Sequence, residues 1–334
     1  MISDGLFDLQ VNGYAGVDFN DPSLTAAQLD LALEAMLLSG VTQCLPTIIT
    51  AFPEELAARF SALDQAVRSS RLGPVMVPGY HLEGPFLNPG DGYSGCHPQA
   101  AMTEPDAALV ARIEDGLTRP ILLVTLAPER EGAINFIAAM RRAGKTLAMG
   151  HSAAGFAQVR AAVDAGLAVS THLGNGLPHI LPKLENTLLA QLSEPRLAAC
   201  LIADGHHLSP DALAAIIRLK GAENCILVTD AVLGAAADPG KYTFAGMGVE
   251  RTHEGKMVQP GRTMLAGSAL CLDQAIRNTM AWTGLGAETA LAMASSAPRR
   301  ALTRTMQHYG IAVEGGHVRW ASDMTPMIER LPGA

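Results

Sequence analysis

The sequence lacks cysteine pairs, a long apolar run and an excess of positive charge. Its five cysteines form no CxxC pair, and this odd count indicates reduced thiols in a cytoplasmic protein. The first residues, MISDGLFDLQVNG, have no basic region followed by an apolar run, so we expect no signal peptide. No segment is apolar for long enough to cross a bilayer, and we expect no membrane contact. The net charge of -8 argues against a nucleic-acid-binding surface.

Aromatic and charged residues are also scarce, at 4% and 17% of the chain. Hydrophobic residues make up 49%, with many alanines and leucines, which provides for a large buried core. This composition is typical of helices packed around a sheet rather than of an all-β sandwich. A chain of 334 residues is the usual length of one α/β barrel, so we expect a single domain over 1–334.

Short apolar runs alternate with Ala-rich amphipathic segments along the first two thirds of the chain. The runs predict eight strands, at 5–12, 41–49, 74–83, 121–129, 146–151, 168–172, 199–205 and 225–231. The segments between them predict helices at 24–40, 53–70, 106–116, 132–144, 155–166, 184–194 and 209–221. Eight such repeats favour a closed (β/α)8 barrel, with an open doubly wound sheet as the alternative.

The chain changes character after the eighth predicted strand, which ends near 231. Turn signals and short β-like runs over 235–265 predict an insertion with β-hairpin character. Residues 266–334 are expected to hold C-terminal helices at 270–284 and 288–306 and a loop-rich tail from His308 with no clear element.

Unusual polar residues stand at the ends of the predicted strands. Glu83, His151, His172 and Asp230 each close a strand. In a barrel these ends meet at the face that carries active sites. One carboxylate and two imidazoles are a plausible catalytic ligand set for a divalent metal, which also offsets the cost of burying Glu83. Asp230 then supplies a carboxylate that moves protons, and the four residues together predict a hydrolytic site.

Each of these residues has a simpler interpretation when taken alone. A single histidine at a strand end is more often a structural residue, and Glu83 or Asp230 would also serve as a helix cap. The combination favours a functional site, because four independent coincidences would otherwise fall at matching ends of the barrel.

These residues also carry a family resemblance. The sequence resembles the amidohydrolase superfamily, and within it the N-acetylglucosamine-6-phosphate deacetylases. The matching runs occur in order from residue 7 to residue 302: FDLQVNGYAGVDFND, HLEGPFLNP, GCHP, LAPE, GHS, THLGNG, IADGHH, LVTDA, LAGS and SAPRRAL. The resemblance implies a barrel enzyme that removes the acetyl group from an amino-sugar 6-phosphate and releases acetate and a free amine.

The resemblance also implies roles for single residues. Glu83, His151 and His172 match the metal ligands, and Asp230 matches the general base that later acts as the acid. His97 matches a histidine that lies near the acetyl carbonyl and stabilises the oxyanion. The implied substrate-binding residues are Asn175, Gly176, His207 and, at the place of a phosphate-binding arginine, Lys183.

The metal site differs from that of many superfamily members, which have HxH at the end of the first strand and bind a second metal there. This chain has Gln10 and Asn12 in that place. Amides are poor replacements for imidazole on a transition metal, so we expect one divalent ion. The ligand types suit Zn2+ best, with Fe2+, Co2+ or Mn2+ as alternatives. His81 shares a face with Glu83 on a strand and is expected to orient the site.

Two further departures concern the outer parts of the molecule. The family usually has a small β-sandwich built from both chain ends, and here we expect it to be missing or vestigial. Lys183 replaces the bidentate arginine, and a lysine binds phosphate only as a point charge. The alternatives are a related amidohydrolase acting on another, unphosphorylated amide, and a non-catalytic metal- or sugar-binding protein. The expected partners are a small-molecule substrate and, from the resemblance, a second copy in a homodimer.

Overall fold

The computed structural model describes residues 1–260 and 265–333, and a parallel barrel is its central element. Eight strands lie in the order β11-β10-β9-β8-β7-β6-β5-β2. A parallel bridge between Val11 and Ala231 joins the first strand to the chain that follows the last one and so closes the sheet. The predicted (β/α)8 barrel is confirmed. The strands are β2 (Leu6–Val11), β5 (Val41–Ile49), β6 (Tyr80–Glu83), β7 (Ile121–Leu126), β8 (Thr146–Met149), β9 (Leu167–Ser170), β10 (Ala198–Leu201) and β11 (Cys225–Leu227).

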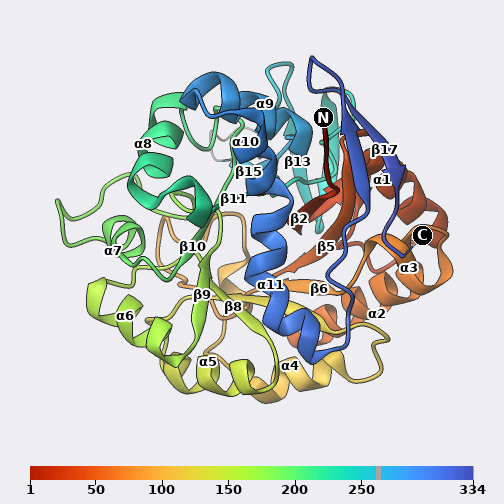
Figure 1. The fold of residues 1–334 in the computed structure, drawn as a ribbon. Helices are drawn as coiled ribbons and strands as arrows, with labels where there is room; N and C mark the ends of the chain where they lie inside the picture. The colour runs from red at the N-terminus through yellow and green to blue at the C-terminus, as the bar shows by residue number, and fades with distance from the viewer. Residues whose placement is uncertain (261–264, 334) are drawn as a thin grey trace.

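Helices surround the barrel strands and form the outer ring of Figure 1. Local sequence fixes their ends: Thr25 and Gln28 form a capping box at the start of α1, and Ser209 caps α8 just before Pro210. The ring contains α1 (Ala26–Leu38), α2 (Pro53–Ser69), α4 (Ala107–Glu114), α5 (Ala133–Arg142), α6 (Phe156–Ala165), α7 (Thr187–Ser193) and α8 (Pro210–Lys220). Two short 3-10 turns, η1 (Gln99–Ala101) and η2 (Ala222–Asn224), lie in the connections.

The third strand is shorter than the sequence predicted. Residues 74–79 do not extend the strand, because Gly73–Met76 form the short helix α3. Pro74 occupies the first turn of that helix, where its missing N–H costs nothing. Strand β6 therefore begins at Tyr80, and its four residues are all buried.

Both chain ends form a small sheet beside the barrel. Strand β1 (Ile2–Asp4) pairs with β16 (His317–Trp320), which pairs with β17 (Pro326–Arg330), all antiparallel. The prediction of a tail without a clear element was wrong. The period-2 burial of His317–Trp320 is a strand signal, but its partner β1 lies more than 300 residues away in the chain. This sheet fits the reduced second domain that the resemblance implies.

A second small sheet follows the barrel strands. It contains β12 (Gly240–Phe244), β13 (Met247–Arg251), β14 (Lys256–Val258) and β15 (Leu265–Ser268), in that order. It is joined to the barrel by a bridge between Ala231 and Ser268. The two-residue strands β3 (Gly13–Tyr14) and β4 (Val17–Asp18) form a hairpin after β2.

Three C-terminal helices complete the fold: α9 (Leu272–Thr283), α10 (Ala287–Ala294) and α11 (Ser296–His308). Helix α11 contacts β2, β7, β8 and β11 and lies in front of the strands in Figure 1. Its buried Arg299 donates to the carbonyl of Gly5 at 2.7 Å and to Gln43 Oε1 at 2.9 Å. These bonds tie the helix to the start of the first two strands, away from the strand ends that hold the predicted site.

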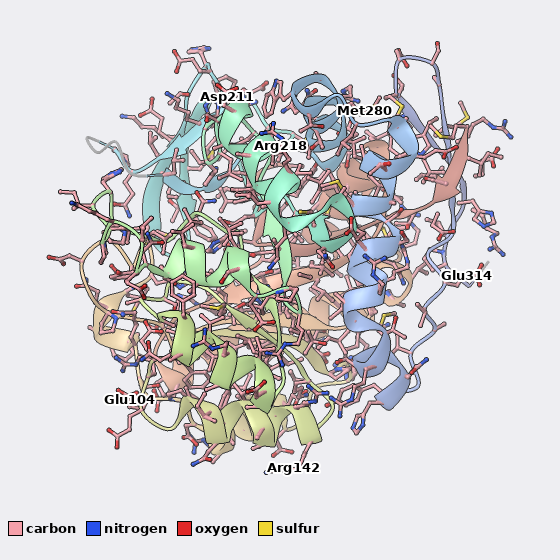
Figure 2. The ribbon with its side chains drawn as sticks, turned by 60° about the vertical axis from the view of Figure 1, so that its left-hand side comes forward. Glu104, Arg142, Asp211, Arg218, Met280 and Glu314 are labelled. Carbon is pink, nitrogen blue, oxygen red and sulfur yellow. The ribbon has the colours of Figure 1, made fainter. Side chains whose placement is uncertain are left out.

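The charged side chains labelled in Figure 2, such as Glu104, Arg142 and Glu314, point outward, and all three are exposed. In the part of the chain that is described, none of the helices combines the length and the apolar character needed to cross a membrane.

Candidate active site

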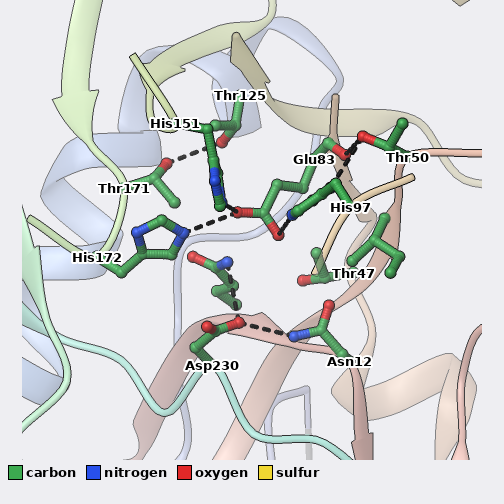
Figure 3. Close-up of polar contacts among 12 residues, drawn as sticks. Asn12, Thr47, Thr50, Glu83, His97, Thr125, His151, Thr171, His172 and Asp230 are labelled. Atoms are coloured by element: carbon green, nitrogen blue, oxygen red, sulfur yellow. Dashed lines mark hydrogen bonds and ion pairs between the residues drawn. The ribbon is translucent and has the colours of Figure 1, made fainter. Parts of the chain in front are cut away.

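The carboxyl ends of the barrel strands bring the predicted residues together (Figure 3). Glu83 is the last residue of β6, while His151 and His172 follow β8 and β9 by two residues. The Nε2 atom of His172 lies 3.0 Å from Glu83 Oε1, and that of His151 lies 3.5 Å from the same oxygen. The structure thus places two histidines from distant parts of the sequence beside one carboxylate.

The backbone at this face is strained in three places. His151, His172 and Asp230 have φ angles of 51°, 29° and 48°, in the left-handed region that residues with a side chain rarely adopt. Such strain persists only where the surrounding structure imposes it, and it is concentrated at functional sites. His151, His172 and Asp230, which the sequence predicts to be functional, share this left-handed conformation. Their residue types alone do not indicate it.

The Glu83 carboxylate is almost completely buried, with 2% of its surface exposed. Burial by itself raises the pKa of a carboxyl group, but hydrogen bonds from His151 and His172 hold the pKa of Glu83 well below its usual range. Glu83 in turn raises the pKa of His172 despite the opposing effect of burial. The site therefore keeps a buried negative charge among imidazoles, as a cation-binding site requires.

His97 is a fourth candidate for this cluster. It comes from the loop after β6, and its Nε2 lies 3.8 Å from Glu83 Oε2. Its Nδ1 is 2.9 Å from the hydroxyl of Thr50. Burial and the neighbouring His151 lower the pKa of His97 to about 3, so the ring is neutral. Glu83, His97 and His151 have donor atoms that all lie within 4.8 Å of one another, so these three described residues could hold a metal ion.

This group overlaps with the predicted ligand set and differs from it by one histidine. The sequence places His172 in the set and His97 near the substrate carbonyl, whereas this group contains His97. A carboxylate with imidazole nitrogens suits Zn2+, Fe2+, Co2+ or Mn2+, so the donor chemistry fits the implied divalent metal with either histidine.

Asp230 faces the same cavity from the end of β11. Its Oδ1 accepts hydrogen bonds from Asn12 Nδ2 at 2.8 Å and from Gln10 Nε2 at 3.1 Å. Burial and the negative charge of Glu83 raise the pKa of Asp230 to about 6. A carboxyl with a pKa near neutrality is suited to accept and return a proton. The two amides at the end of β2 bind Asp230, and so they act on the carboxylate that the sequence predicts to be the base.

His81 lies one layer deeper in the barrel. Its Nδ1 is 3.3 Å from the Thr47 hydroxyl and its Nε2 is 2.8 Å from that of Thr125, which contacts Thr171 at 2.8 Å. Burial lowers the pKa of His81 to about 4, so the ring is neutral. No hydrogen bond joins His81 to Glu83 in the described residues, but the charge of Glu83 acts on the ring directly and partly opposes the lowering of its pKa by burial.

The His151 ring is fixed by the loop that follows β6. Its Nδ1 donates to the carbonyl of Tyr93 at 2.7 Å, and the backbone N–H of Asn88 donates to the His151 carbonyl at 3.1 Å. Gly176 approaches so closely that a Cβ there would lie 2.6 Å from His151 Nδ1. The loop and this glycine together restrict the orientation of the His151 ring.

Glu129, the last residue of the LAPE run, connects the same two segments. Its Oε1 accepts from Asn88 Nδ2 at 2.8 Å and from the Ala153 N–H at 2.6 Å. Its Oε2 accepts from the Ser152 hydroxyl at 2.6 Å. Glu129 therefore joins the loop that fixes the His151 ring to the residues directly after His151. The sequence showed Glu129 only as part of a matching run and did not indicate this role.

A cavity of about 1020 Å³ opens over these residues. Asn175, Gly176 and His207 line it, together with Glu83, the catalytic-site histidines and Asp230. Asn175 is anchored by its N–H and its side-chain amide, which donate to the His172 carbonyl at 3.0 and 3.1 Å. Lys183 is exposed on the loop before α7 and is not among the residues that line the cavity. Lys256 of β14 does line it, and the sequence gave no sign of this.

The chain resembles known deacetylases over most of its length, although no family model matches it. It is 34% identical to an N-acetylgalactosamine-6-phosphate deacetylase of Escherichia coli over 303 residues, covering 90% of this chain and 78% of that protein. It is 31% identical to an N-acetylglucosamine-6-phosphate deacetylase of Vibrio furnissii, with coverage of 89% and 73%.

A solved structure shows the same arrangement of the backbone. The N-acetyl-D-glucosamine-6-phosphate deacetylase of Mycobacterium smegmatis superimposes with a TM-score of 0.86 at 29% identity, covering 98% of this chain and 85% of that one. An aspartate-to-alanine mutant of that protein, in complex with N-acetyl-D-glucosamine-6-phosphate, superimposes with a TM-score of 0.85 over 97% of this chain and 84% of the mutant.

Proposed function

The chain belongs to the amino-sugar-6-phosphate deacetylases of the amidohydrolase superfamily, and on this basis we propose that it hydrolyses the acetamide of an N-acetylated hexosamine 6-phosphate. The products are acetate and the amino-sugar phosphate. The observation that carries this proposal is the buried Glu83 carboxylate, which lies among imidazoles and beside Asp230 at the floor of a cavity.

Glu83, His151 and His172 hold one divalent ion, and Zn2+ suits this donor set best. When bound, such an ion lowers the pKa of a water molecule and polarises a carbonyl group. We assign His172 rather than His97 to the ligand set, because its Nε2 lies 0.8 Å closer to Glu83 than that of His97, at 3.0 Å against 3.8 Å. We expect a single ion, because the amides Gln10 and Asn12 at the end of β2 are poor replacements for imidazole on a transition metal.

The remaining groups act on the proton and on the acetyl carbonyl. Asp230, oriented by its two amide donors, takes the proton of the attacking water and passes it to the departing amine nitrogen. His97 is neutral and contacts the Thr50 hydroxyl through Nδ1. We assign its proton to Nε2, which donates to the oxygen on which negative charge develops. Hydrolysis of the C–N bond is complete when the amine leaves with that proton.

Substrate contacts are assigned to residues that line the cavity. Asn175, Gly176 and His207 do so, and they contact the sugar in this proposal. Lys183 lies outside the cavity and is not included. The two curated relatives act on epimeric sugars by name, one on a galactosamine and one on a glucosamine derivative, and both epimers are candidate substrates here.

We also propose a cytoplasmic homodimer that has neither a nucleic-acid nor a membrane partner. All five cysteines are free, as in a reducing compartment. The loop beside the cavity exposes 89% of Ile180 and 69% of Leu184, and such exposed aliphatic side chains are suited to a subunit contact.

An acetate-release assay tests the proposal. Both epimers of N-acetylhexosamine 6-phosphate, the same sugars without phosphate and an unrelated cyclic amide are supplied to the metal-loaded protein. We expect turnover of at least one phosphorylated sugar. Turnover of the cyclic amide alone would favour a different amidohydrolase, and no turnover of any compound would favour a binding protein.

A further inference from the structure

The wall of the cavity contains an unpaired cation. Among the described residues that line the cavity, Lys256 is the only lysine or arginine. Its side chain is exposed, and it forms no ion pair with any residue in 1–260 or 265–333. A cation that faces a binding cavity without a partner from the protein is available to an anionic ligand.

The backbone that carries Lys256 is well fixed. A tight turn precedes it, in which Thr252 N donates to the Lys256 carbonyl at 2.9 Å and Gly255 N donates to the Thr252 carbonyl at 3.0 Å. His206 Nε2 donates to the carbonyl of Glu254, within this turn, at 3.1 Å. His206 follows β10, so this bond attaches the turn before β14 to the edge of the barrel where the cavity lies.

His207 extends the same edge. Its Nδ1 lies 2.7 Å from Asp204 Oδ2, and both His206 and His207 donate their backbone N–H groups to Asp204 Oδ1 at 2.8 Å. Asp204 thus orients the His207 ring and occupies its Nδ1, and Nε2 remains available to a ligand in the cavity. His206, His207 and Lys256 all line the cavity.

The electrostatics of the site make a local cation necessary for an anionic substrate. The chain has a net charge of -8, and the cavity is lined by the carboxylates Glu83, Asp91 and Asp230. A phosphate dianion entering this field is repelled unless a positive group lies close to it. In the proposed function the divalent ion is held at the floor of the cavity by Glu83 and its two histidines and acts on the acetamide, so a cation for the phosphate has to come from elsewhere.

We propose that Lys256, together with His207 in the lining of the same cavity, binds the phosphate group of the substrate from within the same chain and so selects phosphorylated sugars. This inference rests on the proposed deacetylase function. It assigns to Lys256 the role that the sequence gave to Lys183, whose side chain lies outside the cavity. The acetamide then lies at the floor near Glu83, and the phosphate lies at the wall formed by β14.

The test compares Lys256→Met with wild-type protein on a phosphorylated and an unphosphorylated N-acetylhexosamine. We expect kcat/KM for the phosphorylated sugar to fall about 10- to 100-fold, mostly through KM, because one charge-assisted hydrogen bond is lost. The value for the unphosphorylated sugar should stay the same. Inhibition by inorganic phosphate should weaken by a similar factor in Lys256→Met.

Two other lysines serve as comparisons. Lys241 lies on β12 of the same small sheet, is exposed and does not line the cavity, so Lys241→Met should behave as wild type. Equal losses on both sugars in Lys256→Met, or a selective loss in Lys183→Met in place of Lys256→Met, would overturn the inference. If wild-type protein releases no acetate from any sugar, the proposed function fails, and phosphate binding by wild type and Lys256→Met, followed by calorimetry, still tests Lys256.

Discussion

The Asp230 carboxylate accepts hydrogen bonds from two amide side chains at the end of β2, those of Gln10 and Asn12. From the resemblance, these amides stand where many amidohydrolases are expected to have a pair of metal-binding histidines. In this chain they orient the proposed base. Burial and the nearby Glu83 raise the pKa of Asp230 to about 6, which is suitable for proton transfer.

Asp230→Asn should abolish deacetylation while leaving the metal content unchanged. The amide has nearly the same shape but accepts no proton, and general acid–base groups contribute about 10²- to 10⁴-fold to rates. Acetate release and metal analysis on the same preparation check both parts. The exposed Asp238→Asn is a matched control and should retain full activity. Loss of metal from Asp230→Asn would instead make Asp230 a ligand.

Metal analysis also distinguishes His172 from His97 as the third metal ligand. We expect His172→Ala to lose the metal on dialysis, because it removes an imidazole that lies 3.0 Å from Glu83. His97→Ala should keep the metal and lose activity. The reverse pattern, with metal lost only from His97→Ala, would identify the group of Glu83, His97 and His151 as the ligand set.

The convergence of Glu83, His151, His172 and Asp230 was predictable from the sequence, because strand ends converge in a barrel and all four residues close predicted strands. Their geometry was not predictable. The approach of His97 depends on the path of a long loop, and the left-handed conformation of His151 depends on contacts with Tyr93 and Gly176. Neither feature has a local sequence signal.

At the scale of secondary-structure elements, the loop after β6 and the turn after β8 act as one unit. Glu129 receives hydrogen bonds from both segments, at 2.6 to 2.8 Å, and so stabilises the strained backbone next to His151. The carboxylate does not line the cavity, and we interpret Glu129 as a positioning residue.

Glu129→Ala should weaken metal binding about 10- to 100-fold, which is the usual effect of losing a partner that orients a metal ligand. Glu129→Gln keeps one acceptor oxygen and should restore much of the affinity. Competition with a chromogenic chelator measures the dissociation constants, and thermal unfolding in excess chelator measures stability separately. The exposed neighbour Glu131→Ala is the control. A lower melting temperature with unchanged metal affinity would show that Glu129 has only a structural role.

At the scale of the whole molecule, the alternation of apolar runs and amphipathic segments predicted all eight barrel strands. Two regions were predicted incorrectly for physical reasons. The run before Tyr80 contains Pro74 and Pro78, and the segment Gly73–Met76 is a helix instead of a strand. The tail strands β16 and β17 belong to a sheet in which β1, at the opposite end of the chain, pairs with β16. The short alternation of His317–Trp320 gives no indication of this distant partner.

The barrel interior also makes stability depend on pH through Asp8 of β2. Burial raises the pKa of Asp8 to about 7, although hydrogen bonds from Thr229 oppose this shift. Because the folded-state pKa is raised, this group contributes stability that is fully present below pH 3.8 and is lost as the pH rises to about 7. Asp8→Asn should therefore flatten the decrease in unfolding free energy between pH 4 and 7. Urea denaturation in excess chelator measures this slope, and a slope equal to that of wild type would contradict the assignment.

The central claim is that one divalent ion beside Asp230 enables this chain to hydrolyse the acetamide of an amino-sugar phosphate. The most direct measurement is acetate release from N-acetylhexosamine 6-phosphate during titration of the chelator-stripped protein with Zn2+. We predict no activity in the stripped protein and a linear rise that ends at one equivalent of metal. Full activity without metal, or a rise that continues to two equivalents, would contradict the account.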